Sequence, residues 1–255
     1  MPLNYLSKIL ITNIYKKIRI FSKKNNLFRT LMYHSIYDDK VEITQNNIWK
    51  LSLTLFKEQI NFLNKNKKFY KSENLIYEAP KNGVSITFDD GNDDCYHLVA
   101  PFLFDLKIPF SIFIITNFLK EEKRGYMNEG MLKELSKNPL VSIGSHTKNH
   151  YRLTNYDSST VSNELSESKS YLEDILGKKI NMLSYPHGKY NNLIKKIAME
   201  TGYTLAFSSN FSVNTINQNK FALSRNEIWK SDKIHIFKQK LNGDWDWLKY
   251  RNLQF

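Results

Sequence analysis

The chain alternates between short apolar runs and segments with helical periodicity. Seven runs rich in β-branched and aromatic residues cover residues 27–36, 83–88, 108–115, 140–146, 180–188, 203–209 and 221–229. Helical spacing of apolar residues covers residues 53–68, 93–106, 128–138, 158–179, 191–202 and 232–241. Strands that alternate with helices form parallel β/α units with right-handed crossovers. The pattern therefore predicts an α/β fold, and about seven strands favour a barrel over an open sheet.

Length and composition allow one sizeable hydrophobic core. With 255 residues and 41% hydrophobic content, the chain suits a single domain with modest extensions. It has nine Gly and six Pro, and no stretch resembles a flexible linker between domains. Cys95 is the only cysteine, which excludes an intramolecular disulfide framework and a cysteine-cluster metal site.

Residues 1–24 form a basic arm that contains Lys and Arg but no acidic residue. On a helix, its apolar residues fall on one face and its basic residues lie largely elsewhere, a pattern typical of a helix in a membrane interface. Packing on its own domain or on another subunit is the alternative. A secretory signal or a membrane-spanning run is not evident. We expect an arm at residues 1–24 and a barrel domain at residues 25–255. The apolar positions are Leu3, Leu6, Leu10, Ile14, Ile18 and Phe21.

The formal net charge of +12 also bears on partners. Strong positive charge attracts nucleic acid, anionic membranes or acidic substrates, and charge alone does not choose among them. The chain carries no recognisable nucleic-acid-binding motif, and its most basic stretch is amphipathic. We therefore expect no nucleic-acid partner.

Chemically active side chains follow the carboxyl ends of several predicted strands. Asp89 and Asp90 follow the strand at 83–88, His146 ends the run at 140–146, and His34 follows the first strand. Barrel active sites are assembled from such strand ends. For the Asp-Asp-Gly corner alone, a tight turn is the simpler interpretation. The recurrence at several strand ends favours a site.

His146 and His150 are four residues apart. Together with a carboxylate from another strand, they would form a set of two histidines and one acid, which suits Zn²⁺ or a related divalent ion. Such a set leaves coordination positions open for water and substrate. The sequence therefore indicates a candidate catalytic metal site.

Three motifs give the chain a resemblance to a known family. The stretches "TFDDG", "SHTKNH" and "SYPHG", in this order, resemble the polysaccharide deacetylases, metal-dependent carbohydrate esterases with a distorted (β/α)7 barrel. The resemblance extends from about residue 27 to residue 229. It implies that Asp89 is the general base and that Asp90, His146 and His150 bind a divalent cation, with Zn²⁺ favoured.

The resemblance also suggests roles around the third motif. The turn at Tyr185 and His187 would contact substrate, with the backbone N–H of His187 donating to the tetrahedral oxyanion. Arg225 would orient Asp89 or bind substrate, or would form a structural ion pair. Thr147 would brace the loop between the two histidines.

Two departures from the common family pattern point to one branch. Ser184 stands where many members carry Arg, and a C-terminal Leu-x-His motif is missing. Enzymes that deacetylate poly-N-acetylglucosamine instead carry an N-terminal Tyr-His, which "LMYHSI" matches. His34 would then be the acid that protonates the leaving amine. The alternative is a histidine that caps a strand end by hydrogen bonds.

These observations favour a metal-dependent hydrolase that removes an N-acetyl group from an amino sugar. The substrate would be a cell-surface polysaccharide or its lipid-linked precursor, and a nucleotide-linked precursor is also considered. The enzyme would be cytoplasmic and peripheral at the inner face of the membrane. Removal of a formyl group is one alternative. A non-catalytic protein that binds carbohydrate or membrane on the same scaffold is another.

Overall fold

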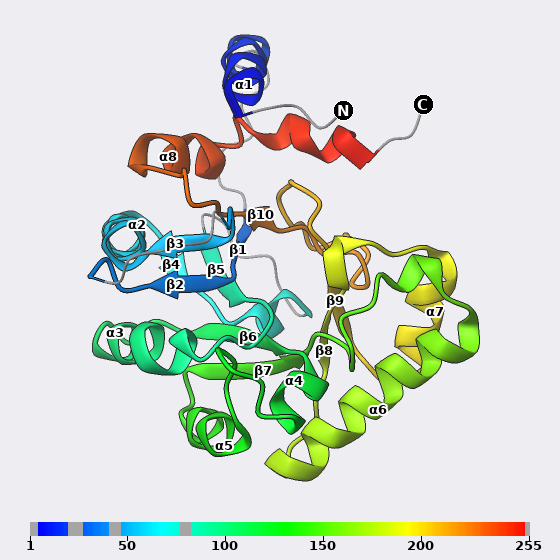
Figure 1. The fold of residues 1–255 in the computed structure, drawn as a ribbon. Helices are drawn as coiled ribbons and strands as arrows, with labels where there is room; N and C mark the ends of the chain where they lie inside the picture. The colour runs from blue at the N-terminus through cyan, green and yellow to red at the C-terminus, as the bar shows by residue number, and fades with distance from the viewer. Residues whose placement is uncertain (1–4, 20–27, 41–46, 77–82, 253–255) are drawn as a thin grey trace.

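A parallel sheet forms the centre of the computed structural model, which describes residues 5–19, 28–40, 47–76 and 83–252 (Figure 1). The strand order is β10-β1-β5-β6-β7-β8-β9, and each paired strand runs parallel to its neighbour. The strands are β1 (Arg29–Tyr33), β5 (Gly83–Phe88), β6 (Phe110–Ile114), β7 (Val141–Ser145), β8 (Met182–Ser184), β9 (Leu205–Phe207) and β10 (Asn226–Glu227). All seven lie within the runs that the sequence predicts.

The two ends of this sheet approach each other. Phe207 in β9 forms a parallel bridge with Leu223, which lies three residues before β10. The Ser208 N–H donates to the Leu223 carbonyl over 2.8 Å. The sheet therefore curves into a distorted (β/α)7 barrel, as predicted.

Three further short strands were not predicted. β4 (Lys68–Phe69) pairs with β5, and β2 (Ser35–Tyr37) pairs with β3 (Lys50–Ser52) in a separate small sheet. Each has two or three residues, too few to show a strand period in the sequence. The β2–β3 sheet brings the loop after β1 next to the segment that precedes α2.

Helices connect the strands and cover the outside of the barrel (Figure 1). Side chains of Ser52, Asn128, Asp157 and Asn191 cap four of them at the N-terminus. A π-helical turn over Cys95–Val99 precedes α3, whose first turn accommodates Pro101. The helices are α1 (Tyr5–Arg19), α2 (Leu53–Asn66), α3 (Ala100–Asp105), α4 (Thr116–Lys120), α5 (Glu129–Lys137), α6 (Ser158–Leu176), α7 (Asn192–Glu200) and α8 (Ile234–Asn242).

The barrel strands are almost entirely buried, so side chains of both strand faces belong to the core. Every residue of β1, β5 and β6 is buried. This is expected for parallel strands covered by helices on the outside and filled by side chains on the inside. The carboxyl ends of the strands share one rim of the barrel, where the candidate site lies.

Helix α1 packs against the body of the protein through one face. The Tyr5 ring stacks on Trp245 with 6.4 Å between centroids, and Trp247 Nε1 donates to Thr12 Oγ1 over 2.9 Å. Figure 1 shows α1 next to α8 and the C-terminal helical segment, away from the barrel. Packing on its own domain, one of the two predicted alternatives, is thus observed.

The opposite face of α1 is apolar and exposed. It carries four large aliphatic side chains at spacings of four residues, with exposed fractions of 53–76%. None of the described helices is long and apolar enough to cross a membrane. Leu3, Phe21 and the boundary expected after residue 24 lie outside the described residues. The exposed residues are Leu6, Leu10, Ile14 and Ile18.

Candidate active site

A cavity of 240 Å³ lies at the carboxyl ends of the strands and collects most of the residues that the sequence singles out. Its lining draws on segments that follow β1, β5, β7 and β8 and on the segment that enters β10. Seven of the eight predicted site residues line it: His34, Asp89, Asp90, His146, His150, His187 and Arg225.

Asp90, His146 and His150 converge in this cavity. Asp90 Oδ1 lies 3.5 Å from His146 Nε2 and 3.6 Å from His150 Nε2. One potential ligand atom from each residue lies within 4.8 Å of the others. A carboxylate and two imidazoles so arranged can share a divalent cation from one side and leave its other side open.

The backbone around the cluster adopts conformations that residues with a Cβ rarely take. Asp90, Thr147, His150 and His187 all have positive φ, between 57° and 73°. Such strain is maintained only where surrounding contacts enforce it, and it concentrates at functional sites. Thr147 supplies one of these contacts, since its Oγ1 accepts from the His150 N–H over 3.2 Å. The predicted bracing role of Thr147 agrees with this bond.

Asp90 and His150 have the protonation states that a cation requires. His146 Nδ1 donates to the Ser184 carbonyl over 2.8 Å, which directs Nε2 towards Asp90. Burial and the neighbouring His146 lower the pKa of His150 to about 3, so this imidazole is neutral. Burial opposes ionisation of Asp90, but the adjacent histidines outweigh it and hold its pKa below the usual range.

One polar atom of the cluster has histidine neighbours but no hydrogen bond within the described part of the chain. Asp90 Oδ1 is buried and has no hydrogen-bond partner among the described residues. A buried carboxylate oxygen normally has one, because an unpaired ionised oxygen is costly. The residues therefore fit a divalent cation at this point. Asp89 and Asp90 also favour the protonated form of His146 against the effect of burial and raise its pKa. A cation would compete with that proton.

Asp89 lies beside the cluster and is held by Arg225. Arg225 donates from Nη1 to Asp89 Oδ1 over 2.6 Å and from Nη2 to Oδ2 over 2.7 Å. The Ser184 hydroxyl donates to Asp89 Oδ2 over 3.1 Å and accepts from Arg225 Nη2 over 2.7 Å. Both ends of the ion pair are fully buried. Ser184, which the sequence marked only as a departure from the family pattern, is thus a partner of the candidate base.

The environment of Asp89 keeps its carboxylate ionised. Burial alone would raise the pKa of Asp89, but Arg225 and then His146 outweigh this effect and lower it. The Arg225 guanidinium is 1% exposed, and its Nε also donates to the Ser208 carbonyl over 2.9 Å. This position fits both orientation of Asp89 and a structural ion pair, two of the roles considered for Arg225.

His34 follows β1 and faces the same cavity. Its ring packs on Trp49 with 4.5 Å between centroids. Among the described residues, its buried Nδ1 has no hydrogen-bond partner, so this nitrogen does not cap a strand end. Trp49 was not identified from the sequence, where it is a single aromatic residue in a polar loop.

The turn after β8 carries two predicted site residues, Tyr185 and His187, and only His187 lines the cavity. The His187 ring lies over His150 with 4.7 Å between centroids. The bonds that close the turn use the N–H groups of Gly188 and Lys189, and neither uses that of His187. Gly188 is required because a Cβ there would lie 2.0 Å from Ser209 Oγ.

Tyr185 does not line the cavity. Its ring is fully buried and stacks on Tyr190, and its hydroxyl donates to the Phe221 carbonyl over 3.1 Å. The expected contact between the Tyr185 side chain and substrate therefore finds no support in its position. The residue fixes the turn that carries His187.

Fold and site together define a distorted parallel barrel with an Asp-His-His cluster and an Arg-held carboxylate at its rim. The sequence model of the family described as polysaccharide deacetylase matches residues 77–206, just over half of the chain. The chain belongs to the polysaccharide deacetylase family.

Relatives and solved structures agree with this assignment. The YxkH protein of Bacillus subtilis, named as a polysaccharide deacetylase, is 30% identical over 142 residues, which cover 56% of this chain and 50% of that protein. Poly-beta-1,6-N-acetyl-D-glucosamine N-deacetylase of Staphylococcus aureus is 26% identical over 234 residues, covering 85% of this chain and 79% of the relative.

Two solved structures share the fold. Streptococcus pyogenes deacetylase PplD superposes with a TM-score of 0.76 at 23% identity, over 86% of this chain and 99% of that one. IcaB from Ammonifex degensii gives a TM-score of 0.74 at 20% identity, over 87% and 98%. At these identities, the likeness concerns the fold.

Proposed function

We propose that this protein is a metal-dependent N-deacetylase acting on an amino sugar of a cell-surface polysaccharide or its lipid-linked precursor. One observation carries the proposal: three potential ligands converge beside a second carboxylate that is not one of them. Asp89 Oδ2 lies 3.8 Å from His146 Nε2, and its two oxygens are engaged by Arg225. The similarity to the staphylococcal poly-N-acetylglucosamine deacetylases supports the acetyl group and the sugar class.

Asp90, His146 and His150 would hold the cation, for which the ligand set favours Zn²⁺. A divalent cation bound there lowers the pKa of water and polarises an amide carbonyl. The residues around it supply the proton transfers. Their positions in one cavity support a division of roles between the two neighbouring carboxylates.

Asp89 accepts the proton of the attacking water, because it is ionised and is oriented by Arg225. The water oxygen bonds to the acyl carbon, and the backbone N–H of His187 donates to the oxyanion that forms. His34 then protonates the sugar nitrogen as the C–N bond breaks. The products are acetate and a free amino sugar.

A direct test measures acetate released by the purified full-length chain from β-1,6-linked N-acetylglucosamine oligomers, before and after removal of metal with a chelator. We expect release that stops on chelation and returns with Zn²⁺. Formate released from a formamido sugar would favour the deformylase alternative. A protein that binds metal and oligomers but releases neither acid would contradict catalysis and favour the binding-protein alternative.

The exposed face of α1 supports attachment to an anionic membrane surface. Four aliphatic side chains project from this face, and Lys16 and Lys17 are also exposed on the helix, which has no acidic residue. An amphipathic helix with these features binds the interface by burying its apolar face while its basic residues meet anionic lipid. A location at the inner face of the cytoplasmic membrane would fit a lipid-linked substrate.

A further inference from the structure

A second, larger cavity adjoins the candidate active site. Its volume is 820 Å³, within the range of small-molecule sites. It shares four lining residues with the catalytic cavity, namely Trp49, His187, Ser209 and Glu227. Tyr5 and Lys8 of α1 also line it. We call it the α1 groove, because it extends from the catalytic cavity to this helix.

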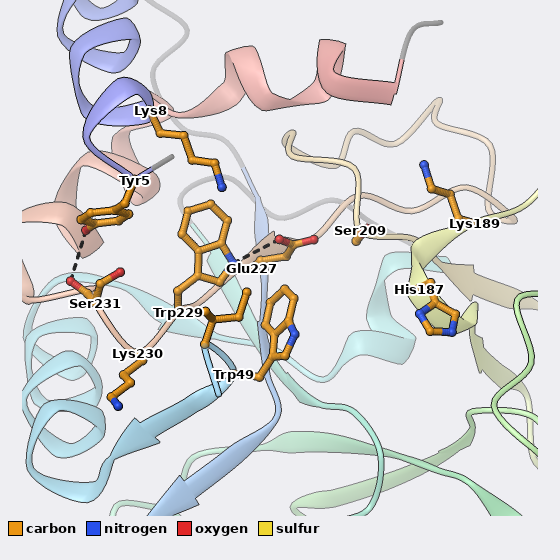
Figure 2. A pocket seen from close by; sticks show the side chains of 11 residues that line it. Tyr5, Lys8, Trp49, His187, Lys189, Ser209, Glu227, Trp229, Lys230 and Ser231 are labelled. Atoms are coloured by element: carbon orange, nitrogen blue, oxygen red, sulfur yellow. Dashed lines mark hydrogen bonds between the residues drawn. The ribbon is translucent and has the colours of Figure 1, made fainter. Parts of the chain in front are cut away.

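Positive charge dominates the lining of the α1 groove. Figure 2 shows Lys8 reaching from α1 towards Trp229, and Lys189 on the opposite side near His187. Of the described lining residues, only Glu227 is acidic, and its carboxylate accepts a hydrogen bond from Trp229 Nε1 over 3.2 Å. Lysines on facing walls of a concave site attract an anionic group to the space between them.

Aromatic rings form one wall of the groove. The Trp229 ring is held in place by Lys240, whose Nζ lies 3.6 Å from its centroid, while Lys8 Nζ lies 4.5 Å from the same ring. Trp49 stands next to Trp229 (Figure 2). Its ring also contacts His34. Flat apolar walls combined with a few placed charges are the composition of a site for a ring-containing ligand with an anionic substituent.

We propose that the α1 groove binds the phosphate-bearing end of a saccharide substrate. Lys8 and Lys189 pair with the phosphate, and Trp49, which is partly exposed and lines both cavities, packs against the acetylated sugar, whose acetamido group enters the catalytic cavity. This inference rests on the proposed deacetylase function and defines its substrate as a phosphorylated or pyrophosphoryl-linked amino sugar. It also gives α1 a part in substrate binding, through the face opposite its exposed aliphatic side chains.

The test is a binding titration that does not depend on turnover. The metal-loaded Asp89→Asn variant of the full chain is titrated calorimetrically with N-acetylglucosamine 1-phosphate and with the neutral methyl N-acetylglucosaminide. We expect the phosphorylated sugar to bind at least about 10-fold more tightly, the value of one charge-assisted hydrogen bond. Addition of Lys8→Gln or Lys189→Gln should remove most of that preference.

Two matched variants control for loss of structure and loss of overall charge. Lys8→Arg should retain the preference, and Lys17→Gln, an exposed lysine of the same helix, should leave it unchanged. Equal affinity for the two sugars would overturn the inference. So would a preference that survives both groove substitutions.

Further ligands distinguish the source of the phosphate. Tighter binding of a short-chain polyprenyl diphosphate N-acetylglucosamine than of the sugar phosphate supports a lipid-linked substrate, and tighter binding of the uridine diphosphate sugar supports a nucleotide-linked one. Acetate release by the wild-type chain is measured separately. A lysine-dependent preference without acetate release would refute the deacetylase proposal but retain the subsite. Equal kcat/KM for phosphorylated and neutral sugars, unaffected by the lysine variants, would refute only the subsite.

Discussion

Arg225 binds both oxygens of Asp89 while Asp89 lies 3.8 Å from His146 Nε2, at the edge of the Asp-His-His cluster. The guanidinium comes from the segment before β10 and the carboxylate from the end of β5, so the pair joins strand ends that are far apart in sequence. It keeps one acid of the Asp89-Asp90 pair oriented and ionised, while the other faces the two histidines.

Replacement of Arg225 should therefore change the pH profile of the reaction. Arg225 lowers the pKa of Asp89, so Arg225→Gln should raise it and move the acidic limb of kcat/KM to higher pH. Loss of orientation should also lower the plateau by about 100-fold.

Arg225→Lys is the matched variant for this prediction. It keeps the charge but cannot form both parallel hydrogen bonds, so the plateau should fall while the limb moves less. Thermal unfolding monitors the fold of both variants. An acidic limb that stays at its wild-type pH in Arg225→Gln would contradict the assigned relationship.

His34→Ala should reduce turnover by about 100-fold or more, because the leaving amine loses its proton donor. Its metal content should remain at the wild-type value, since His34 is not one of the clustered ligands. Initial rates of acetate release and elemental analysis of the same preparation check both statements. Wild-type turnover would refute the role of His34 as the acid.

Substitution of Asp94 should stabilise the folded protein by an amount that depends on pH. Burial raises the pKa of Asp94 to about 7 despite the hydrogen bond from Ser35. The unfolded chain releases this proton near pH 4, whereas the folded protein retains it up to about pH 7, so folding becomes less favourable as the pH rises between these values.

Asp94→Asn should thus stabilise the protein at pH 8 by up to about 4 kcal/mol, the full value of a pKa raised from 3.8 to about 7, and the gain should decrease towards pH 4. Urea unfolding of both proteins at pH 4.5 and pH 8 measures the difference. The same gain at both pH values would show that ionisation of Asp94 is not its cause.

The exposed face of α1 predicts membrane binding. Leu10→Ser and Ile14→Ser together should weaken binding to anionic lipid vesicles by at least about 10-fold for each residue, because each large side chain contributes about 1.5–3 kcal/mol when buried. Met199→Ser is the control, since Met199 is similarly exposed but lies on α7. Co-sedimentation with vesicles measures the effect, and equal binding of all variants would refute attachment through α1.

The barrel could be predicted from the sequence because its strands are continuous apolar runs that end in polar residues. Asp89 and His146 follow such runs directly, so their place on one rim followed from parallel topology. The strands β2 and β3 could not be predicted, since three-residue strands that pair across a loop leave no period in the sequence. Trp49 was missed as well. It lies directly before β3, and its contact with His34 depends on the pairing of β3 with β2, which the sequence does not indicate.

Two other features could not be predicted from the sequence, namely the orientation of the Tyr185 ring and the surroundings of each face of α1. Tyr185 and His187 belong to one short motif, but Tyr185 is extended and directs its ring into the core, whereas the positive φ of His187 accompanies a turn towards the cavity. In α1, periodicity identified an amphipathic helix but not what each side covers. One side of the helix packs on the protein and the other is exposed.

The most direct test of the account is the metal content of Asp89→Asn compared with that of Asp90→Asn, measured on purified full-length protein by elemental analysis. We expect the Asp89 variant to retain about one cation per chain and to lose acetate release, whereas the Asp90 variant should lose the cation itself. An Asp89 variant that loses metal as completely as the Asp90 variant, or a wild-type chain that binds none, would contradict it.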